Sequence, residues 1–479
     1  MRRDAQAVTF ALLLTQRIGQ LTVLGVALLG CSGDRDTPTS PAVTTTKPSV
    51  ILVSIDTLRA DHVGLYGYAR DTTPFLDRWS KDATVFEHAY TTAAWTLVAH
   101  MTMLTGLFPE QHDVIGKRRA LSPEIPLLAE RLHAAGYRTI GLHAPGWVVE
   151  RHGFQRGFDV FLEHKSLEEA DRHLSTVLDE LGDGRPFFLF LHLFDVHCGP
   201  FPNPDNAVYP APPKYERMFA SAGCAPLPET PAEKLWETPG LVNAEQLKTL
   251  VDTYDGGIRQ VDDQLAAWFR ELEERGLLTG ALTIVTSDHG EALGQRGRLD
   301  RHGEYWQEGL HVPLIVRHPA GQLAGTRVPQ PVHLGDLVPT ILATCGLALD
   351  QRLPGRSLFG PLPEERVIAG MKLPEAFVLK GFEKLVAGPK NWCVVMNLEH
   401  DPRELAPKPG DRKRFEELRS EAIGTDKFPP ALRIDELSPT DEADLKALGY
   451  AGDTDDAGDA GNAGASGQGK GKEDESKPR

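Results

Sequence analysis

The sequence predicts an α/β protein in which helices sandwich a mainly parallel central sheet, with a small C-terminal antiparallel subdomain. Apolar, largely β-branched or aromatic runs recur along the first two thirds of the chain, as expected for strands buried on both faces. Amphipathic stretches of helical length separate these runs, and strands that alternate with helices form parallel sheets. After about residue 365, short strand-like runs separated by a turn signal predict the antiparallel part.

The predicted elements follow in order along the chain. We expect strands at 49–55, 138–143, 187–194, 282–287 and 312–317, and helices at 124–135, 167–181, 243–274 and 334–347. Two further strands, 377–386 and 391–398, flank the turn Gly388-Pro389-Lys390. Because ligands of parallel sheets bind beyond the carboxyl ends of the strands, the residues that follow each apolar run are the candidates for a site.

The N-terminus has the features of an export signal. Arg2 and Arg3 precede an apolar run that ends at Leu28-Leu29-Gly30-Cys31, and so short a run is typical of a signal peptide rather than of a membrane span. Its end resembles a bacterial lipoprotein cleavage box, which implies lipidation of Cys31. A plain signal peptide or a short anchor helix is the alternative. We expect residues 1–31 to be the signal peptide of an exported, membrane-anchored lipoprotein, in the periplasm or at the cell surface.

Composition divides the rest of the chain. Residues 32–48 are rich in Thr, Pro and Ser, as expected of a linker. Residues 49–365 carry the predicted sheet and are the expected catalytic domain. We expect residues 366–451 to form the small C-terminal subdomain and a closing helix. Gly, Ala, Asp and Lys dominate 452–479, so we expect this tail to be disordered.

Charge and cysteines narrow the class of protein. With 67 acidic and 51 basic residues the formal net charge is −16, which argues against non-specific binding to nucleic acid. A small anionic ligand stays compatible with this charge, because a metal ion and a few cations can dominate the field of one pocket. Export permits a disulfide, and Cys198 with Cys224 is the pair we expect, although spacing alone leaves the connectivity open. The segment 198–240 looks like an insertion that sets specificity.

Carboxylates follow two of the predicted strands. Asp56 comes directly after the first strand, and Asp288-His289 follows the strand 282–287. A carboxylate at the end of a buried strand is costly unless a partner compensates it, and a divalent cation would do so. The alternative for each residue alone is a turn former or helix cap. Together they indicate a metal site.

Between these two segments lies Thr96, at the start of a mildly apolar stretch that ends in Thr105-Gly106. A threonine hydroxyl is a poor nucleophile at neutral pH, and coordination to a cation makes it usable. A helix N-cap is the alternative reading of Thr96. Thr96 can serve as nucleophile and as helix cap together, since a helix N-terminus also attracts an anionic substrate.

Several segments occur in a characteristic order. They are Val53–His62 with Tyr66-Gly67, Thr96–Gly106, Phe194–His197, Thr286–Glu291, His302-Gly303 and Val312–Leu314. In this order they resemble the sulfatase family of the alkaline phosphatase superfamily, over about residues 49–408. The resemblance implies an alkaline-phosphatase-like fold and one divalent metal on Asp56, Asp288 and His289, with Thr96 as nucleophile and further metal contact. A mostly oxygen site suits Ca²⁺, Mg²⁺ or Mn²⁺ before Zn²⁺.

The nucleophile position departs from the family pattern. Sulfatases usually carry a Cys or Ser there, which is oxidised to formylglycine, and threonine cannot give that aldehyde. The maturation signal is also altered, with Val98 and His100 in place of the usual Pro and Arg. We therefore expect no formylglycine and an unmodified Thr96, as in phosphodiesterase and phosphoglycerol-transferase relatives. This favours phosphate esters over sulfate esters.

Three histidines are candidates for handling the substrate. His100 lies one helical turn after Thr96, and the resemblance implies that His197 and His302 bind the anionic group or protonate the leaving oxygen. The function expected first is a metal-dependent hydrolase of sulfate or phosphate esters on a glycan, lipid or small molecule. One alternative is a phosphoglycerol- or phosphoethanolamine-type transferase acting on lipid or glycan. Another is a non-catalytic binding protein with a sulfatase fold, suggested by Thr57, Val98 and Ala99.

Overall fold

The computed structural model describes residues 47–181, 184–198, 209, 211–221, 225–227, 242–297, 299–300 and 305–447. The main sheet has eight strands in the order β13-β2-β12-β8-β1-β7-β5-β6. These are β1 (Val50–Ile55), β2 (Thr84–Phe86), β5 (Arg138–His143), β6 (Val160–Glu163), β7 (Phe187–Leu193), β8 (Leu282–Thr286), β12 (Leu314–Arg317) and β13 (Arg327–Val328). β1 lies at the centre and pairs in parallel with β7 and β8, while β12 runs antiparallel to β8. The predicted mainly parallel sheet is confirmed.

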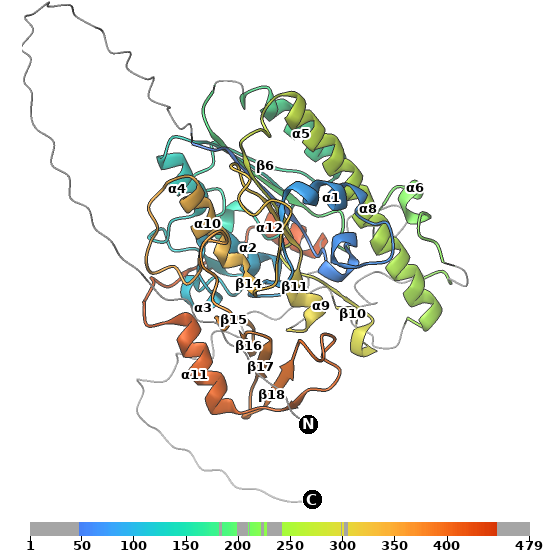
Figure 1. Cartoon of the computed structure of the whole chain (residues 1–479), viewed down its shortest axis with the longest axis vertical. Helices are drawn as coiled ribbons and strands as arrows, with labels where there is room; N and C mark the ends of the chain where they lie inside the picture. Colours follow the sequence, from blue (N-terminus) through green and yellow to red (C-terminus); the bar gives the residue numbers. More distant parts are fainter. Residues whose placement is uncertain are drawn as a thin grey trace, which may run out of the picture. The chain divides into compact units, whose positions relative to one another are not determined.

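Helices cover both faces of this sheet (Figure 1). Alternate side chains of β1 point to opposite faces: Val50 and Leu52 join one apolar cluster, and Ile51 and Val53 join the other. The first cluster is covered by α2 (Thr96–Thr105), α4 (Leu128–Ala134) and α10 (Leu337–Thr344), and the second by α1 (Pro74–Trp79), α5 (Leu167–Leu178) and α8 (Ala244–Glu274). A strand buried on both sides is therefore the reason for the unbroken apolar run.

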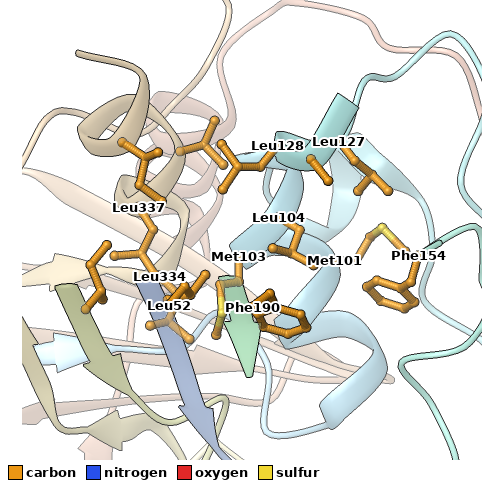
Figure 2. Close-up of a cluster of buried hydrophobic side chains, with 14 of the residues drawn as sticks. Leu52, Met101, Met103, Leu104, Leu127, Leu128, Phe154, Phe190, Leu334 and Leu337 are labelled. Atoms are coloured by element: carbon orange, nitrogen blue, oxygen red, sulfur yellow. The ribbon is translucent and has the colours of Figure 1, made fainter. Parts of the chain in front are cut away.

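Helix α2 is buried along its whole length. Figure 2 shows its Met101, Met103 and Leu104 between side chains of the sheet, Leu52 and Phe190, and those of flanking segments. The helix ends at Gly106, whose φ of 78° suits glycine at a helix C-terminus. Apolar packing on several sides thus fixes the helix that begins with Thr96.

The predicted helices are confirmed with shifted ends. Asn243 caps α8, since its Oδ1 accepts hydrogen bonds from the backbone N–H groups of Glu245 (3.0 Å) and Gln246 (2.9 Å). Helix α4 begins at Leu128 rather than at residue 124. The predicted strand 312–317 is interrupted at Pro313, which separates β11 (His311–Val312) from β12, because proline has no N–H for the ladder.

The C-terminal part contains an antiparallel sheet covered by one helix. The strands are β15 (Val367–Lys372), β16 (Glu375–Lys380), β17 (Glu383–Ala387), β18 (Cys393–Asn397) and β19 (Lys408–Pro409), and the helix is α11 (Arg412–Ile423). Phe415 and Leu418 of α11 pack in one cluster with Val378 and Leu385 of the sheet. The predicted single strand 377–386 is wrong, because the chain turns at Gly381, whose φ is +57°. Strand β15 was not predicted.

The described residues also contain shorter strands, helices and 3₁₀ turns. They are strands β3 (Ala89–Tyr90), β4 (Arg119–Ala120), β9 (Ala292–Leu293), β10 (Leu299–Asp300), β14 (Val332–His333) and β20 (Leu432–Arg433), helices α3 (Pro109–His112), α6 (Pro213–Glu216), α9 (Gln307–Leu310) and α12 (Pro439–Ala447), and the 3₁₀ turns η1 (Ala60–His62), η2 (Gly64–Tyr66), η3 (Ser80–Asp82), η4 (Glu150–His152), η6 (Gln295–Gly297) and η7 (Leu334–Asp336). Within the part that the structure describes, no helix is both long and apolar enough to cross a membrane. The predicted signal peptide with Cys31, the linker up to residue 46 and the tail lie outside it.

Candidate metal centre and active site

Asp56 directly follows β1 at the carboxyl edge of the sheet. Its backbone N–H donates to the carbonyl of Leu193 at the end of β7 (2.8 Å), so the parallel pairing continues into the site. The side chain is fully buried, and Oδ1 has no hydrogen-bond partner. Burial raises the pKa of Asp56 to about 6, although His289 and Thr96 oppose the shift. A buried carboxylate with an unpaired oxygen is the environment that a cation would stabilise.

Asp288 and His289 follow β8, the parallel neighbour of β1. Asp288 Oδ1 accepts hydrogen bonds from the backbone N–H groups of Thr57 (3.2 Å) and His289 (2.8 Å), while its buried Oδ2 has no hydrogen-bond partner. His289 Nδ1 lies 2.8 Å from the carbonyl of Gly290. This contact assigns the ring proton to Nδ1 and leaves the Nε2 lone pair available to a metal.

Thr96 is the first residue of α2, and its hydroxyl faces both metal segments. Thr96 Oγ1 lies 3.3 Å from Asp56 Oδ2 and 3.2 Å from His289 Nε2. The N-cap is Trp95, and no side chain caps the helix there. The reading of Thr96 as a helix cap is therefore wrong, because its hydroxyl points to the carboxylate and imidazole instead of a backbone N–H.

The residues fit a divalent cation. Asp56, Asp288 and His289 each offer one ligand atom, and these atoms lie within 4.8 Å of one another. His289 Nε2 is 3.5 Å from Asp288 Oδ2 and 3.9 Å from Asp56 Oδ1. The two oxygens in these pairs are the ones that no hydrogen bond satisfies. Two carboxylates and one imidazole would balance and hold one such ion.

Two further buried histidines lie against this group, and His100 with His192 and Asp288 forms a second set of possible ligands. Burial lowers the pKa of His100 and of His192 to about 3, and the imidazole of His192 adds a smaller lowering effect on His100. Both histidines are therefore neutral at physiological pH. His100 Nδ1 lies 2.9 Å from the carbonyl of Thr96 and Nε2 lies 3.0 Å from the hydroxyl of Ser54. Both nitrogens of His100 are thus in hydrogen bonds, which favours the first set as the metal site.

The loop after Asp56 is strained and held from α8. Thr57 has a φ of +57°, a region that β-branched residues rarely adopt. Tyr254 donates a hydrogen bond to the carbonyl of Thr57 (2.7 Å) and accepts one from the N–H of Arg59 (3.0 Å). The Arg59 guanidinium in turn donates to the carbonyl of Glu291 (2.9 Å). These contacts join the two metal segments.

The structure describes only some of the other predicted site residues. His197 follows β7 and is buried with its ring stacked on Phe194 at 4.1 Å, so its substrate role stays a prediction. His302 and Cys224 lie outside the described residues, which leaves the role of His302 and the Cys198–Cys224 pair as predictions. Sequence reasoning missed His192, whose Nε2 lies 3.1 Å from Asp56 Oδ2. Its signal was an imidazole inside an otherwise apolar strand.

Three comparisons with known proteins agree with this fold. The sequence model of the Sulfatase family matches residues 48–347. The multifunctional alkaline phosphatase superfamily protein PehA of Trinickia caryophylli is 27% identical over 406 residues, covering 67% of this chain and 78% of that protein. An arylsulfatase of Clostridium perfringens is 22% identical over 383 residues, covering 67% and 79%.

Solved structures show the same fold. The phosphonate monoester hydrolase of Agrobacterium radiobacter superposes with a TM-score of 0.64 at 20% identity, covering 78% of this chain and 96% of that one. A protein solved with its substrate D-glucosamine-2-N,6-O-disulfate gives a TM-score of 0.61 at 16% identity, with coverages of 78% and 96%.

Proposed function

The chain belongs to the sulfatase family, and we propose that it is a metal-dependent hydrolase that cleaves a phosphate or sulfate ester by attack of the unmodified Thr96 hydroxyl. The observation that carries the proposal is the position of Thr96 Oγ1, within 3.3 Å of Asp56 Oδ2 and 3.2 Å of His289 Nε2. A nucleophile in contact with the metal-binding side chains is the arrangement that ester hydrolysis by this route needs.

Each side chain has a separate task in this proposal. Asp56, Asp288 and His289 would hold the metal ion, and a bound divalent cation would lower the pKa of the Thr96 hydroxyl and neutralise charge on the substrate. Thr96 Oγ1 forms a bond to the central phosphorus or sulfur, and the bond from that atom to the leaving oxygen breaks. The Thr96 proton passes to the leaving oxygen, which departs as the alcohol. Water then attacks the phosphorus or sulfur, releases the acid and returns a proton to Thr96 Oγ1.

The substrate class follows from the nucleophile and the relatives. Names among the relatives and neighbours include a phosphonate monoester hydrolase, arylsulfatases and an N-acetylglucosamine-6-O-sulfatase. Each name describes an enzyme that acts on an anionic ester or phosphonate. Because threonine cannot supply the formylglycine aldehyde, we place phosphate and phosphonate esters before sulfate esters for this chain.

Activity of metal-reloaded protein tests this function. The full chain is stripped with a chelator, reloaded with Mn²⁺, Mg²⁺ or Ca²⁺, and assayed on an aryl phosphate, a phosphodiester, a phosphonate monoester and an aryl sulfate. We expect metal-dependent turnover that falls roughly 10³-fold or more in Thr96→Ala and is partly kept in Thr96→Ser. A loss of less than tenfold in Thr96→Ala would overturn the role of Thr96.

A matched control lies in the same helix. Thr105 is also buried in α2, and its hydroxyl donates to the carbonyl of Met101 (2.6 Å), not to a metal ligand. Thr105→Ala should therefore keep its turnover while losing about 1 kcal/mol of stability. Product analysis with glycerol as competing acceptor distinguishes hydrolysis from group transfer. Absence of any metal-induced rise in melting temperature would favour a non-catalytic binding protein.

We also propose that the enzyme is exported and anchored to a membrane through lipidated Cys31. The support is the sequence pattern Leu28-Leu29-Gly30-Cys31 at the end of an apolar run. Cys31→Ser should move the protein from the membrane fraction to the soluble fraction of its host. Equal distribution of both forms would contradict the anchor.

A further inference from the structure

The buried histidine of β7 contacts a metal ligand without belonging to the first set of ligands. His192 is fully buried, and its Nε2 lies 3.1 Å from Asp56 Oδ2. The register pairs it with Ser54 of β1, two residues before Asp56. Since β1 and β7 are neighbouring parallel strands, the position of this imidazole is fixed by the centre of the sheet rather than by a loop.

Hydrogen bonding assigns the direction of this contact. An ionised carboxylate only accepts, so His192 Nε2–H donates to Asp56 Oδ2. His192 Nδ1 is buried without a hydrogen-bond partner, which is less costly for a lone pair than for an N–H group. The carbonyl of His192 accepts from His164 Nε2 (3.0 Å), and that bond holds the backbone of the strand end.

The contact decides which oxygen of Asp56 faces the metal. Asp56 Oδ2 has two neighbouring donors, His192 Nε2–H and the Thr96 hydroxyl, while Oδ1 has no hydrogen-bond partner and lies 3.9 Å from His289 Nε2. A carboxylate torsion is broad and roughly two-fold, so it needs a fixed donor to hold one orientation. Without His192 only the Thr96 hydroxyl would hold Oδ2, and Thr96 is itself proposed to react.

We propose that His192 is a positioning residue for the metal centre, which fixes the Asp56 carboxylate so that Oδ1 binds the ion while Thr96 stays beside Oδ2. The inference rests on the proposed function only in requiring that this site binds a metal. Outer hydrogen bonds to metal ligands typically change metal affinity 10–100-fold when removed.

The second set of possible ligands gives a competing role. His192, His100 and Asp288 could hold a second ion, in which case His192 Nε2 would be a ligand rather than a donor to Asp56. The contacts of His100 argue against this, because its Nδ1 lies closer to the carbonyl of Thr96 (2.9 Å) than to Asp288 Oδ2 (3.5 Å). If His192 is a positioning residue, the titration should show one bound ion per chain. Two bound ions per chain would overturn the proposal.

Calorimetric titration of the metal-free full chain with Mn²⁺ tests the proposal, with the melting temperature in chelator measured alongside. His192→Leu should weaken binding 10–100-fold, whereas His192→Gln, whose amide can replace the Nε2–H donor, should bind within about threefold of wild type. The matched control is His143→Leu on β5, which removes an imidazole that is also buried and bonds the carbonyl of Ala144 (3.1 Å). It should lower the melting temperature and leave the Mn²⁺ affinity unchanged.

The outcomes separate this proposal from the proposed function. If folded His192→Leu binds Mn²⁺ as wild type does, His192 has no positioning role. If His192→Leu does not fold, His192→Asn replaces it; the shorter amide cannot reach Asp56 in the same way, and equal affinity of the Asn and Gln variants overturns the proposal. Wild-type protein that binds none of Mn²⁺, Mg²⁺ and Ca²⁺ would instead refute the proposed function.

Discussion

Replacing Asp56 with asparagine should stabilise the metal-free protein at pH 8 while abolishing its response to metal. The carboxyl group is fully buried, and burial raises its pKa from 3.8 to about 6. A group with a raised pKa binds its proton more tightly in the folded state. The folded state therefore loses stability as the pH rises from about 4 to about 6, and the full cost is present above that window.

The magnitude follows from the same two values. A shift of about two pKa units corresponds to about 3 kcal/mol at pH 8, and linkage gives about half of that at pH 5. Asparagine has nearly the same shape and no charge, so Asp56→Asn removes this cost. For a chain of this size, each kcal/mol changes the melting temperature by roughly 1–2 °C. We expect a rise of roughly 3–5 °C at pH 8 and a smaller one at pH 5.

Thermal unfolding in chelator and with added Mn²⁺, at both pH values, measures these effects. Mn²⁺ should raise the melting temperature of wild type and leave that of Asp56→Asn unchanged, because the variant lacks one charged ligand. The control is Asp82→Asn, where the carboxylate is 75% exposed and little should change. A lower melting temperature of Asp56→Asn in chelator at pH 8 would refute the burial argument, and a preserved Mn²⁺ shift would refute the ligand assignment.

Two further pairs of substitutions test a buried ion pair beside the C-terminal sheet and the contact of α9 with the segment after His289. Lys384 Nζ donates to Glu404 Oε1 (2.6 Å) and both side chains are buried, so Lys384→Met should cost roughly 3–5 kcal/mol by leaving a buried charge unpaired. Adding Glu404→Leu should recover part of this stability but not all, because Glu404 Oε2 also accepts from the N–H of Gln307 (2.8 Å). A lower unfolding midpoint for the double variant than for Lys384→Met alone would contradict this prediction. Gly290 directly follows His289, and a Cβ added there would meet the carbonyl oxygen of Glu308. Because the backbone beside His289 would have to shift, Gly290→Ala should weaken Mn²⁺ binding. Gly276→Ala, with a φ of +71° and open space around it, should cost only about 1 kcal/mol and leave Mn²⁺ binding unchanged, as titration would show.

Most of the candidate metal centre could be predicted, because its residues follow the ends of strands. Asp56 and Asp288 follow two apolar runs, and the parallel pairing of β1 with β8 brings their ends together. This step needs only the rule that parallel strands share a carboxyl edge. Thr96 joins them because α2 begins at that same edge. The order of the motifs along the sequence suggested this position, but the hydrophobic periodicity of the helix did not require it.

His192 could not be placed in the same way. Its role depends on the register between β1 and β7 and on which face of the strand it occupies, and neither is visible in a run of continuously apolar residues. The turn at Gly381 was missed for a related reason, since a single glycine within an apolar run also occurs inside strands.

The charges of the cluster restrict the substrate further. Asp56 and Asp288 contribute two negative charges, and His100 and His192 are neutral because burial lowers their pKa to about 3. One divalent cation therefore balances the cluster and leaves no excess positive charge among these side chains. A singly charged group, as in a phosphodiester, phosphonate monoester or sulfate monoester, should bind at lower electrostatic cost than a doubly charged phosphate monoester. We expect a higher kcat/KM for bis-aryl phosphate than for aryl phosphate at pH 8, and the reverse order would mean that cations outside this cluster contribute to the site.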